Sequence, residues 1–89
     1  MKLQVKFSNR FKKDLKLAKK NLNKLFEVIE KLANLEILAE KYRDYPLIGE
    51  YKGLRECHIE QDWVLIYYIE NNTLTLVLSR LGSHLDLFI

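Results

Sequence analysis

Three side chains near the carboxyl end carry the kinds of group that chemistry on a nucleic acid requires: Arg80, His84 and Phe88. Arginine is a fixed cation that can bind a phosphate, and histidine titrates near neutral pH and can move a proton. A phenyl ring offers a flat face on which a base can stack. Together these residues predict a site that binds a phosphate and transfers protons beside a stacked base.

The residues between them indicate how these groups could meet. Gly82 permits a sharp bend after an apolar run, and Ser83 with Asp86 matches the S-x-x-D start of a helical turn. If that turn forms, His84 and Phe88 stand four residues apart and share a face. A plainer interpretation, which spacing alone favours, is a hydrophobic plug that closes the core. Its members would be Leu85, Leu87 and Phe88.

A second pair of titratable residues lies in the middle of the chain. Strand alternation places Glu56 and His58 on one face together with Leu54. The other face carries Arg55, Cys57 and Ile59. Two titratable groups on one strand face could transfer a proton, or they could form a surface ion pair that contributes little stability. Without a visible partner for the pair, the residues favour the surface ion pair.

Basic residues are concentrated in the first half of the chain. The net charge is +3 overall, but it is +6 over residues 1–44 and −3 over residues 45–89. The cations are chiefly Arg10, Lys12, Lys13, Lys16, Lys19, Lys20 and Lys24. A basic stripe of this kind attracts a polyanion and gives salt-dependent binding. It is equally typical of a solvated helix face, so both interpretations stay open.

Periodicity predicts one strand and two helices in the first half. Residues 3–7 alternate between apolar and polar, as in a half-buried strand. Ser8 offers an N-cap for a helix over about residues 9–20, and a second helical period runs over about residues 25–38. The short connection between the helices favours an antiparallel helical hairpin.

The second half is predicted to be mainly strand. Residues 39–53 have an irregular pattern that contains Pro46 and two glycines. Three strand candidates follow at 54–60, 63–69 and 73–81, joined by two-residue links of the hairpin kind. The order β-α-α-β-β-β predicts an α+β fold in which a mainly antiparallel sheet packs against the helical hairpin, with a short C-terminal helical turn.

The composition is that of one small domain, which we expect to span residues 1–89. Hydrophobic residues make up 48% of the chain, enough for a packed core. The single Cys57 cannot form an internal disulfide; we expect it to be a buried filler in a reducing, cytoplasmic compartment. We expect no signal peptide and no membrane span, because 63–69 is far shorter than the roughly 20 residues a crossing needs. Trp63 is expected to anchor the core.

Several blocks of residues, matched in order and spacing, resemble the YafQ branch of the RelE/ParE superfamily of bacterial toxins. The blocks span residues 42–49, 52–58, 62–67 and 80–84, with Phe88 four positions further on. The resemblance covers essentially all 89 residues, and it is specific from Pro46 onward and generic in the helices. It implies a single RelE-like toxin domain.

The resemblance also implies an activity and partners. Toxins of this family are endoribonucleases that cut messenger RNA in the ribosomal A site and thereby inhibit translation, and they are silenced by an antitoxin of the DinJ kind. The resemblance implies a metal-free cleavage in which the ribose 2′-oxygen attacks the adjacent phosphorus and leaves a 2′,3′-cyclic phosphate. We expect no cofactor, because the sequence has no Gly-rich nucleotide-binding loop, zinc-spaced Cys/His set or calcium loop. We expect the basic stripe to contact ribosomal RNA or to be covered by the antitoxin. The residues predicted to bind ribosomal RNA are Arg10, Lys12, Lys13, Lys16, Lys19 and Lys20.

Matched to the family's pattern, five residues are predicted to form the catalytic centre. His84 matches the C-terminal histidine and is predicted to be the general acid, while His58 is a candidate base. Asp62 would orient a histidine, and Arg80 would hold the phosphate and stabilise developing charge. Phe88 would stack on the substrate base.

Four further residues complete the predicted substrate-binding set: Tyr45, Glu56, Trp63 and Lys52. Tyr45 stands where the family often has histidine, and with a reference pKa of about 10 it is a poor base at neutral pH. It could still donate a hydrogen bond or stack on a base. Glu56 stands where an aspartate is common. Which residue acts as general base stays open.

Two other functions fit parts of the chain. A ParE-like toxin that inhibits DNA gyrase would have the same fold but no chemical use for Arg80, His84 and Phe88. An inactive relative that binds only the antitoxin is favoured by Tyr45 alone.

Overall fold

The computed structural model describes residues 2–88. They form, in chain order, β1 (Gln4–Phe7), α1 (Asn9–Leu17), α2 (Leu22–Ala33), the 3₁₀ turn η1 (Glu40–Tyr42), β2 (Tyr45–Pro46), the 3₁₀ turn η2 (Gly49–Tyr51), β3 (Arg55–Glu60), β4 (Trp63–Glu70), β5 (Thr75–Gly82) and α3 (His84–Phe88). Among these residues, none of the helices has the length and apolar character that a bilayer crossing requires.

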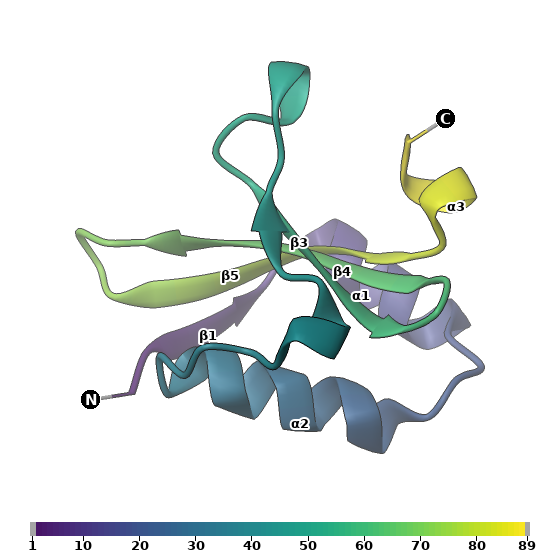
Figure 1. The fold of residues 1–89 in the computed structure, drawn as a ribbon, viewed down its shortest axis with the longest axis horizontal. Helices are drawn as coiled ribbons and strands as arrows, with labels where there is room; N and C mark the ends of the chain where they lie inside the picture. Colours follow the sequence, from purple (N-terminus) through teal and green to yellow (C-terminus); the bar gives the residue numbers. More distant parts are fainter. Residues whose placement is uncertain (1, 89) are drawn as a thin grey trace.

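The strands of residues 2–88 form one five-stranded sheet with the order β1-β5-β4-β3-β2 (Figure 1). β3, β4 and β5 are joined as an antiparallel meander, and β1 adds in parallel at the β5 edge. The predicted mainly antiparallel sheet is therefore confirmed. The prediction missed β2, because two residues carry no visible period. Pro46 is tolerated there since β2 is an edge strand, where a missing N–H costs no ladder hydrogen bond.

The boundary between the two helices lies earlier than predicted. α1 ends at Leu17, not near residue 20, because Ala18 has an extended backbone with ψ 130°. α2 then begins at Leu22 rather than near residue 25. Asn21 is its N-cap, since its side chain accepts a hydrogen bond from the Asn23 N–H at 3.0 Å. Asn21 therefore marks the start of the second helix.

The end of α2 also differs from the prediction, at Ala33 rather than near residue 38. Leu35 has a left-handed backbone with φ 62°. The Glu36 N–H donates to the Lys31 carbonyl and the Leu35 N–H to the Leu32 carbonyl, each at 3.0 Å. This pair of hydrogen bonds is a Schellman motif, which ends a helix by satisfying its last carbonyls. The sequence did not predict this helix end, because leucine occupies the position that glycine usually takes.

The chain reverses direction between α1 and α2, as a helical hairpin requires (Figure 1). α1 packs chiefly against β5, and α2 contacts β3. Phe11 of α1 and Leu25 of α2 are fully buried against Leu65 and Leu76 of the sheet. Helix and sheet residues therefore share one core.

Two predictions about single core residues can be judged from their burial. Cys57 is completely buried, which confirms the filler interpretation. Trp63 is 3% exposed and belongs to the core cluster, which confirms it as an anchor. Its predicted contact with substrate stays a prediction; Trp63 also lines a cavity together with Asp62 and Arg80.

We expect Phe11→Ala to lower the free energy of unfolding by about 3–5 kcal/mol, because it removes a fully buried ring and leaves a cavity. Phe26→Ala is the matched control, since Phe26 is 46% exposed, and we expect it to cost about 1 kcal/mol or less. Urea unfolding followed by circular dichroism measures both changes. Equal losses for the two variants would contradict the assignment of the core.

Candidate active site

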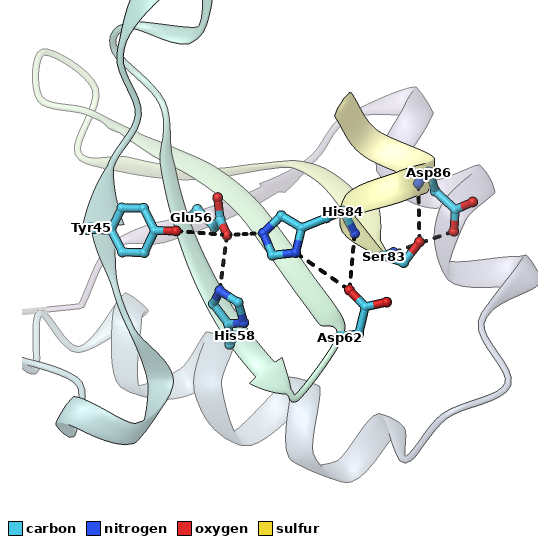
Figure 2. A network of polar contacts seen from close by, with 7 residues as sticks. All are labelled: Tyr45, Glu56, His58, Asp62, Ser83, His84 and Asp86. Atoms are coloured by element: carbon cyan, nitrogen blue, oxygen red, sulfur yellow. Dashed lines mark hydrogen bonds and ion pairs between the residues drawn. The ribbon is translucent and has the colours of Figure 1, made fainter. Parts of the chain in front are cut away.

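A single carboxylate gathers the polar residues on the face of the sheet away from the helices. Glu56 of β3 is only 2% exposed, and its Oε1 contacts three polar side chains. It accepts hydrogen bonds from Tyr45 Oη at 3.3 Å and His84 Nε2 at 2.5 Å, and it lies 3.1 Å from His58 Nε2. Figure 2 shows the three side chains pointing at this one oxygen. Elements far apart in sequence thereby meet at one point.

Burial overturns one interpretation of the Glu56 and His58 pair. Their side chains are 3% and 10% exposed, so a surface ion pair is wrong. The predicted alternation along β3 is confirmed, because Cys57 and Ile59 point into the core on the other face. A buried carboxylate beside an imidazole is the arrangement expected of a proton-transfer pair.

His84 contacts a carboxylate with each of its ring nitrogens. Nε2 lies on Glu56, and Nδ1 lies 3.5 Å from Asp62 Oδ1. Asp62 also accepts a hydrogen bond from the His84 backbone N–H at 3.3 Å. Asp62 reaches both groups because it lies in the two-residue turn between β3 and β4. When the ring carries two protons, both nitrogens have an acceptor, and that state is the one a general acid needs.

The helical turn predicted after Gly82 is confirmed as α3. Asp86 N–H donates to Ser83 Oγ at 3.1 Å, and Ser83 N–H donates to Asp86 Oδ2 at 3.4 Å, which together form a capping box. The hydrophobic plug is wrong, because Leu85 is 68% exposed and no residue of α3 is buried. The turn positions His84 rather than closing the core.

Phe88 lies against both catalytic and loop residues. Its ring stacks on His84 with centroids 5.7 Å apart and planes 26° apart. Its other neighbour is Tyr51 of η2, whose ring packs edge-on at 5.1 Å. Tyr51 was missed by the sequence analysis, because an aromatic residue in an irregular loop carries no periodic signal.

Arg80 lies apart from the Glu56 contacts. Its Nε and a terminal nitrogen bind the carboxylate of Asp14 in α1 at 2.8 and 3.3 Å, and Asp14 also accepts from the Leu81 N–H at 2.9 Å. The hydrogen bond to Asp14 raises the pKa of Arg80, which keeps the guanidinium charged. Together with Phe88 and Tyr51, Arg80 lines a cavity of about 410 Å³. Arg80 thus faces the stacked ring, while Asp14, which the sequence analysis missed, fixes its position.

Tyr45 donates a hydrogen bond to Glu56. Desolvation raises the pKa of its phenol, and the charge of Glu56 raises it further, so the hydroxyl keeps its proton at neutral pH. The predicted contact of Tyr45 with substrate stays a prediction.

A second polar network holds the segment that carries Tyr45. Asp44 accepts a hydrogen bond from Tyr67 Oη at 2.6 Å and one from Arg55 Nε at 3.2 Å. Burial raises the pKa of Tyr67, so this phenol also remains a donor. The network ties the start of β2 to β3 and β4, and the sequence carried no signal for it.

The remaining predicted residues lie away from Glu56. Lys52 is exposed at the end of η2, and no hydrogen bond or ion pair within residues 2–88 joins it to the two histidines. The cations predicted to bind ribosomal RNA are also exposed. Arg10, Lys12, Lys13 and Lys16 lie on α1, whereas Lys19 and Lys20 lie in the following loop. These assignments stay predictions.

The geometry of the centre also permits metal coordination. The ligand atoms of Glu56, His58 and His84 lie within 4.8 Å of one another. Two imidazoles and one carboxylate are a donor set that divalent transition metals accept. The expected absence of a metal stays a prediction.

Comparison with known proteins identifies the family. The family described as "Bacterial toxin of type II toxin-antitoxin system, YafQ" matches residues 3–89. The chain is 39% identical over 88 residues to the mRNA interferase toxin YafQ of Escherichia coli K12, covering 94% of each chain.

Solved structures agree with this result. A metal-bound toxin from Helicobacter pylori superposes with a TM-score of 0.90 and 44% identity, over 97% of this chain and 99% of that one. The Escherichia coli DinJ–YafQ complex matches with a TM-score of 0.87 and 36% identity, over the full length of both chains. The chain belongs to the YafQ family of bacterial toxins of type II toxin–antitoxin systems.

Proposed function

We propose that this toxin is an mRNA interferase, an endoribonuclease that cuts messenger RNA in the ribosomal A site without a catalytic metal and so inhibits translation. Membership in the YafQ family supports this activity, since the Escherichia coli relative carries that name. The observation that carries the proposal is the convergence of His58 and His84 on buried Glu56, beside Phe88.

The reaction needs a base and an acid on opposite sides of one phosphorus. His58 has Nε2 on Glu56, and no hydrogen bond within residues 2–88 engages its Nδ1. This nitrogen takes the proton of the 2′-hydroxyl as the 2′-oxygen bonds to phosphorus. The bond from phosphorus to the 5′-oxygen breaks, and the leaving oxygen takes a proton from His84. The products are a 2′,3′-cyclic phosphate and a 5′-hydroxyl.

The surrounding residues hold these groups in place and bind the substrate. Asp62 and Glu56 orient the His84 ring, and Glu56 is itself held by the Tyr45 hydroxyl. Arg80 stabilises the negative charge that develops on the phosphate, and Phe88 stacks on a substrate base. The ring of His84 also lies close to that of His58, with centroids 5.2 Å apart. This spacing suits one imidazole that takes the proton of the attacking 2′-hydroxyl and another that protonates the leaving 5′-oxygen.

Inhibition of DNA gyrase is not favoured as an alternative. The matching relatives are YafQ toxins, and two of them are named mRNA interferases. The partner we propose is a DinJ-like antitoxin, since Escherichia coli YafQ is known in complex with DinJ. We further propose that the toxin acts in the cytoplasm, where the basic residues of α1 and its following loop contact ribosomal RNA.

We expect His84→Ala to slow cleavage by about 10²–10⁴-fold, because it removes the general acid. Leu85→Ala is the matched control, since Leu85 is the exposed neighbour on the same turn, and it should leave cleavage unchanged. Primer extension on programmed ribosomes measures both. Unchanged cutting by His84→Ala would remove this residue from the mechanism.

We expect Tyr45→Phe to reduce cleavage by at most about tenfold, the equivalent of one lost hydrogen bond. Because the pKa of Tyr45 is raised, the phenol is protonated throughout the neutral range, so the pH profile should keep its shape. Rates measured between pH 5 and 9 test this, with Tyr68→Phe as control. Loss of one limb of the profile in Tyr45→Phe would instead make Tyr45 a proton carrier.

We expect Lys16→Glu to weaken ribosome binding and to flatten its dependence on salt, because fewer counterions are released. The triple change of Lys13, Lys16 and Lys20 to Glu should enlarge both effects. Lys31→Glu is the control, since Lys16 and Lys31 occupy the last turns of α1 and α2 respectively. Equal ribosome affinities for Lys16→Glu and Lys31→Glu would show that the basic stripe is only a solvated face.

A further inference from the structure

A cavity beside the two histidines is lined by both His58 and His84, and its volume is about 600 Å³. Arg80 is not among the described residues that line it. The lining also includes Lys24 of α2, Lys41 of η1 and Arg43 just after η1. None of these three cations belongs to the catalytic or substrate-binding set described above.

The three cations have no acidic partner among residues 2–88. All three side chains are exposed, and no ion pair in that range includes them, whereas Arg80 and Arg55 are held by Asp14 and Asp44. Of the two glutamates on the cavity wall, Glu27 lies 3.9 Å from Lys31 and is partly neutralised by it. The cavity wall is therefore net positive, which suits an anion.

The backbone that presents Arg43 is fixed in an unusual conformation. Arg43 has φ 47° and ψ 53°, the left-handed region that a non-glycine residue adopts at an energetic cost. The Asp44 network with Arg55 and Tyr67 anchors the next residue. Arg43 is thus held at the cavity wall by a backbone segment that Asp44 anchors.

We propose that Lys24, Lys41 and Arg43 bind the phosphate of the nucleotide next to the scissile linkage in the messenger RNA strand. The inference rests on the proposed roles of His58 and His84, because it places the cleaved linkage at their rings. A single strand carries one phosphate for each nucleotide, so a strand held at the histidines brings a neighbouring phosphate to the adjoining wall. Arg80 lines a different cavity from these three cations, so the two sets of charges are placed to contact different phosphates of one strand.

The test uses dinucleotides with a 2′-deoxy sugar at the linkage, which cannot be cleaved. One probe is unmodified, a second carries a 5′-phosphate and a third a 3′-phosphate. Chemical shifts of the His58 and His84 imidazoles report binding, and these are the two histidines of the chain. We expect one phosphorylated probe to bind the wild-type toxin about tenfold more tightly than the unmodified probe, as one charge-assisted contact implies.

The variant for this test combines Lys24→Gln, Lys41→Gln and Arg43→Gln. It should lose the preference for the phosphorylated probe and keep the affinity for the unmodified one. A control that combines Lys2→Gln and Lys6→Gln removes positive charge away from the cavity and should bind like the wild type. A wild-type toxin with no preference, or a triple variant that keeps it, would overturn the proposal.

Two further measurements distinguish a failure of the phosphate-site proposal from a failure of the proposed catalytic mechanism. If the cations bind ribosomal RNA instead, the triple variant will bind ribosomes without messenger RNA more weakly and will keep the probe preference, which overturns the proposal. His84→Ala, observed through the His58 signal, should retain the probe preference. Retained preference together with unchanged cleavage by His84→Ala would reject the catalytic role of His84 and leave the phosphate site supported.

Discussion

The hydrogen bonds accepted by one oxygen of Glu56 organise the functional face of this toxin. A carboxylate that is 2% exposed must be satisfied by polar partners, and here Tyr45 and His84 donate hydrogen bonds while His58 lies within ion-pair distance. They come from an edge strand, the central part of the sheet and the C-terminal turn. The position of each imidazole therefore depends on the same buried oxygen, and moving Glu56 would displace the proposed acid and base together.

The two faces of the sheet differ in what they carry: one packs against the helices to form the core, and the other carries the polar groups of the candidate site. The helices cover one face with a continuous core, and the other face keeps polar groups at the ends of β3 and β5. At the edge of β5, Asp14 satisfies the Leu81 N–H and fixes the Arg80 guanidinium at once. Asp44, just before β2, accepts hydrogen bonds from the side chains of Arg55 and Tyr67. The guanidinium groups of Arg80 and Arg55 are thus each held by a carboxylate from another element of the fold.

Much of the fold followed from local pattern, while element ends did not. Alternation along β3 sorted Glu56 and His58 from Cys57 and Ile59, which is confirmed because Cys57 and Ile59 belong to the core cluster while Glu56 contacts His58 and His84. The ends of α2 were misplaced because they depend on Asn21 as a cap and on the left-handed Leu35, neither of which interrupts the apolar period. Strand β2 escaped prediction because it is held by its neighbours and not by its own sequence.

The sequence by itself determined the strand and helix order, the capped C-terminal turn and the residue types that could perform acid–base chemistry, because each depends on neighbours within a few positions. Only the tertiary structure decided which groups pair. Arg80 meets Asp14 across 66 positions, and His84 meets Glu56 across 28. It also decided that the Glu56 and His58 pair is buried and that Lys24, Lys41 and Arg43 share one cavity with the histidines. Such contacts arise from packing distant segments together, and no local period encodes them.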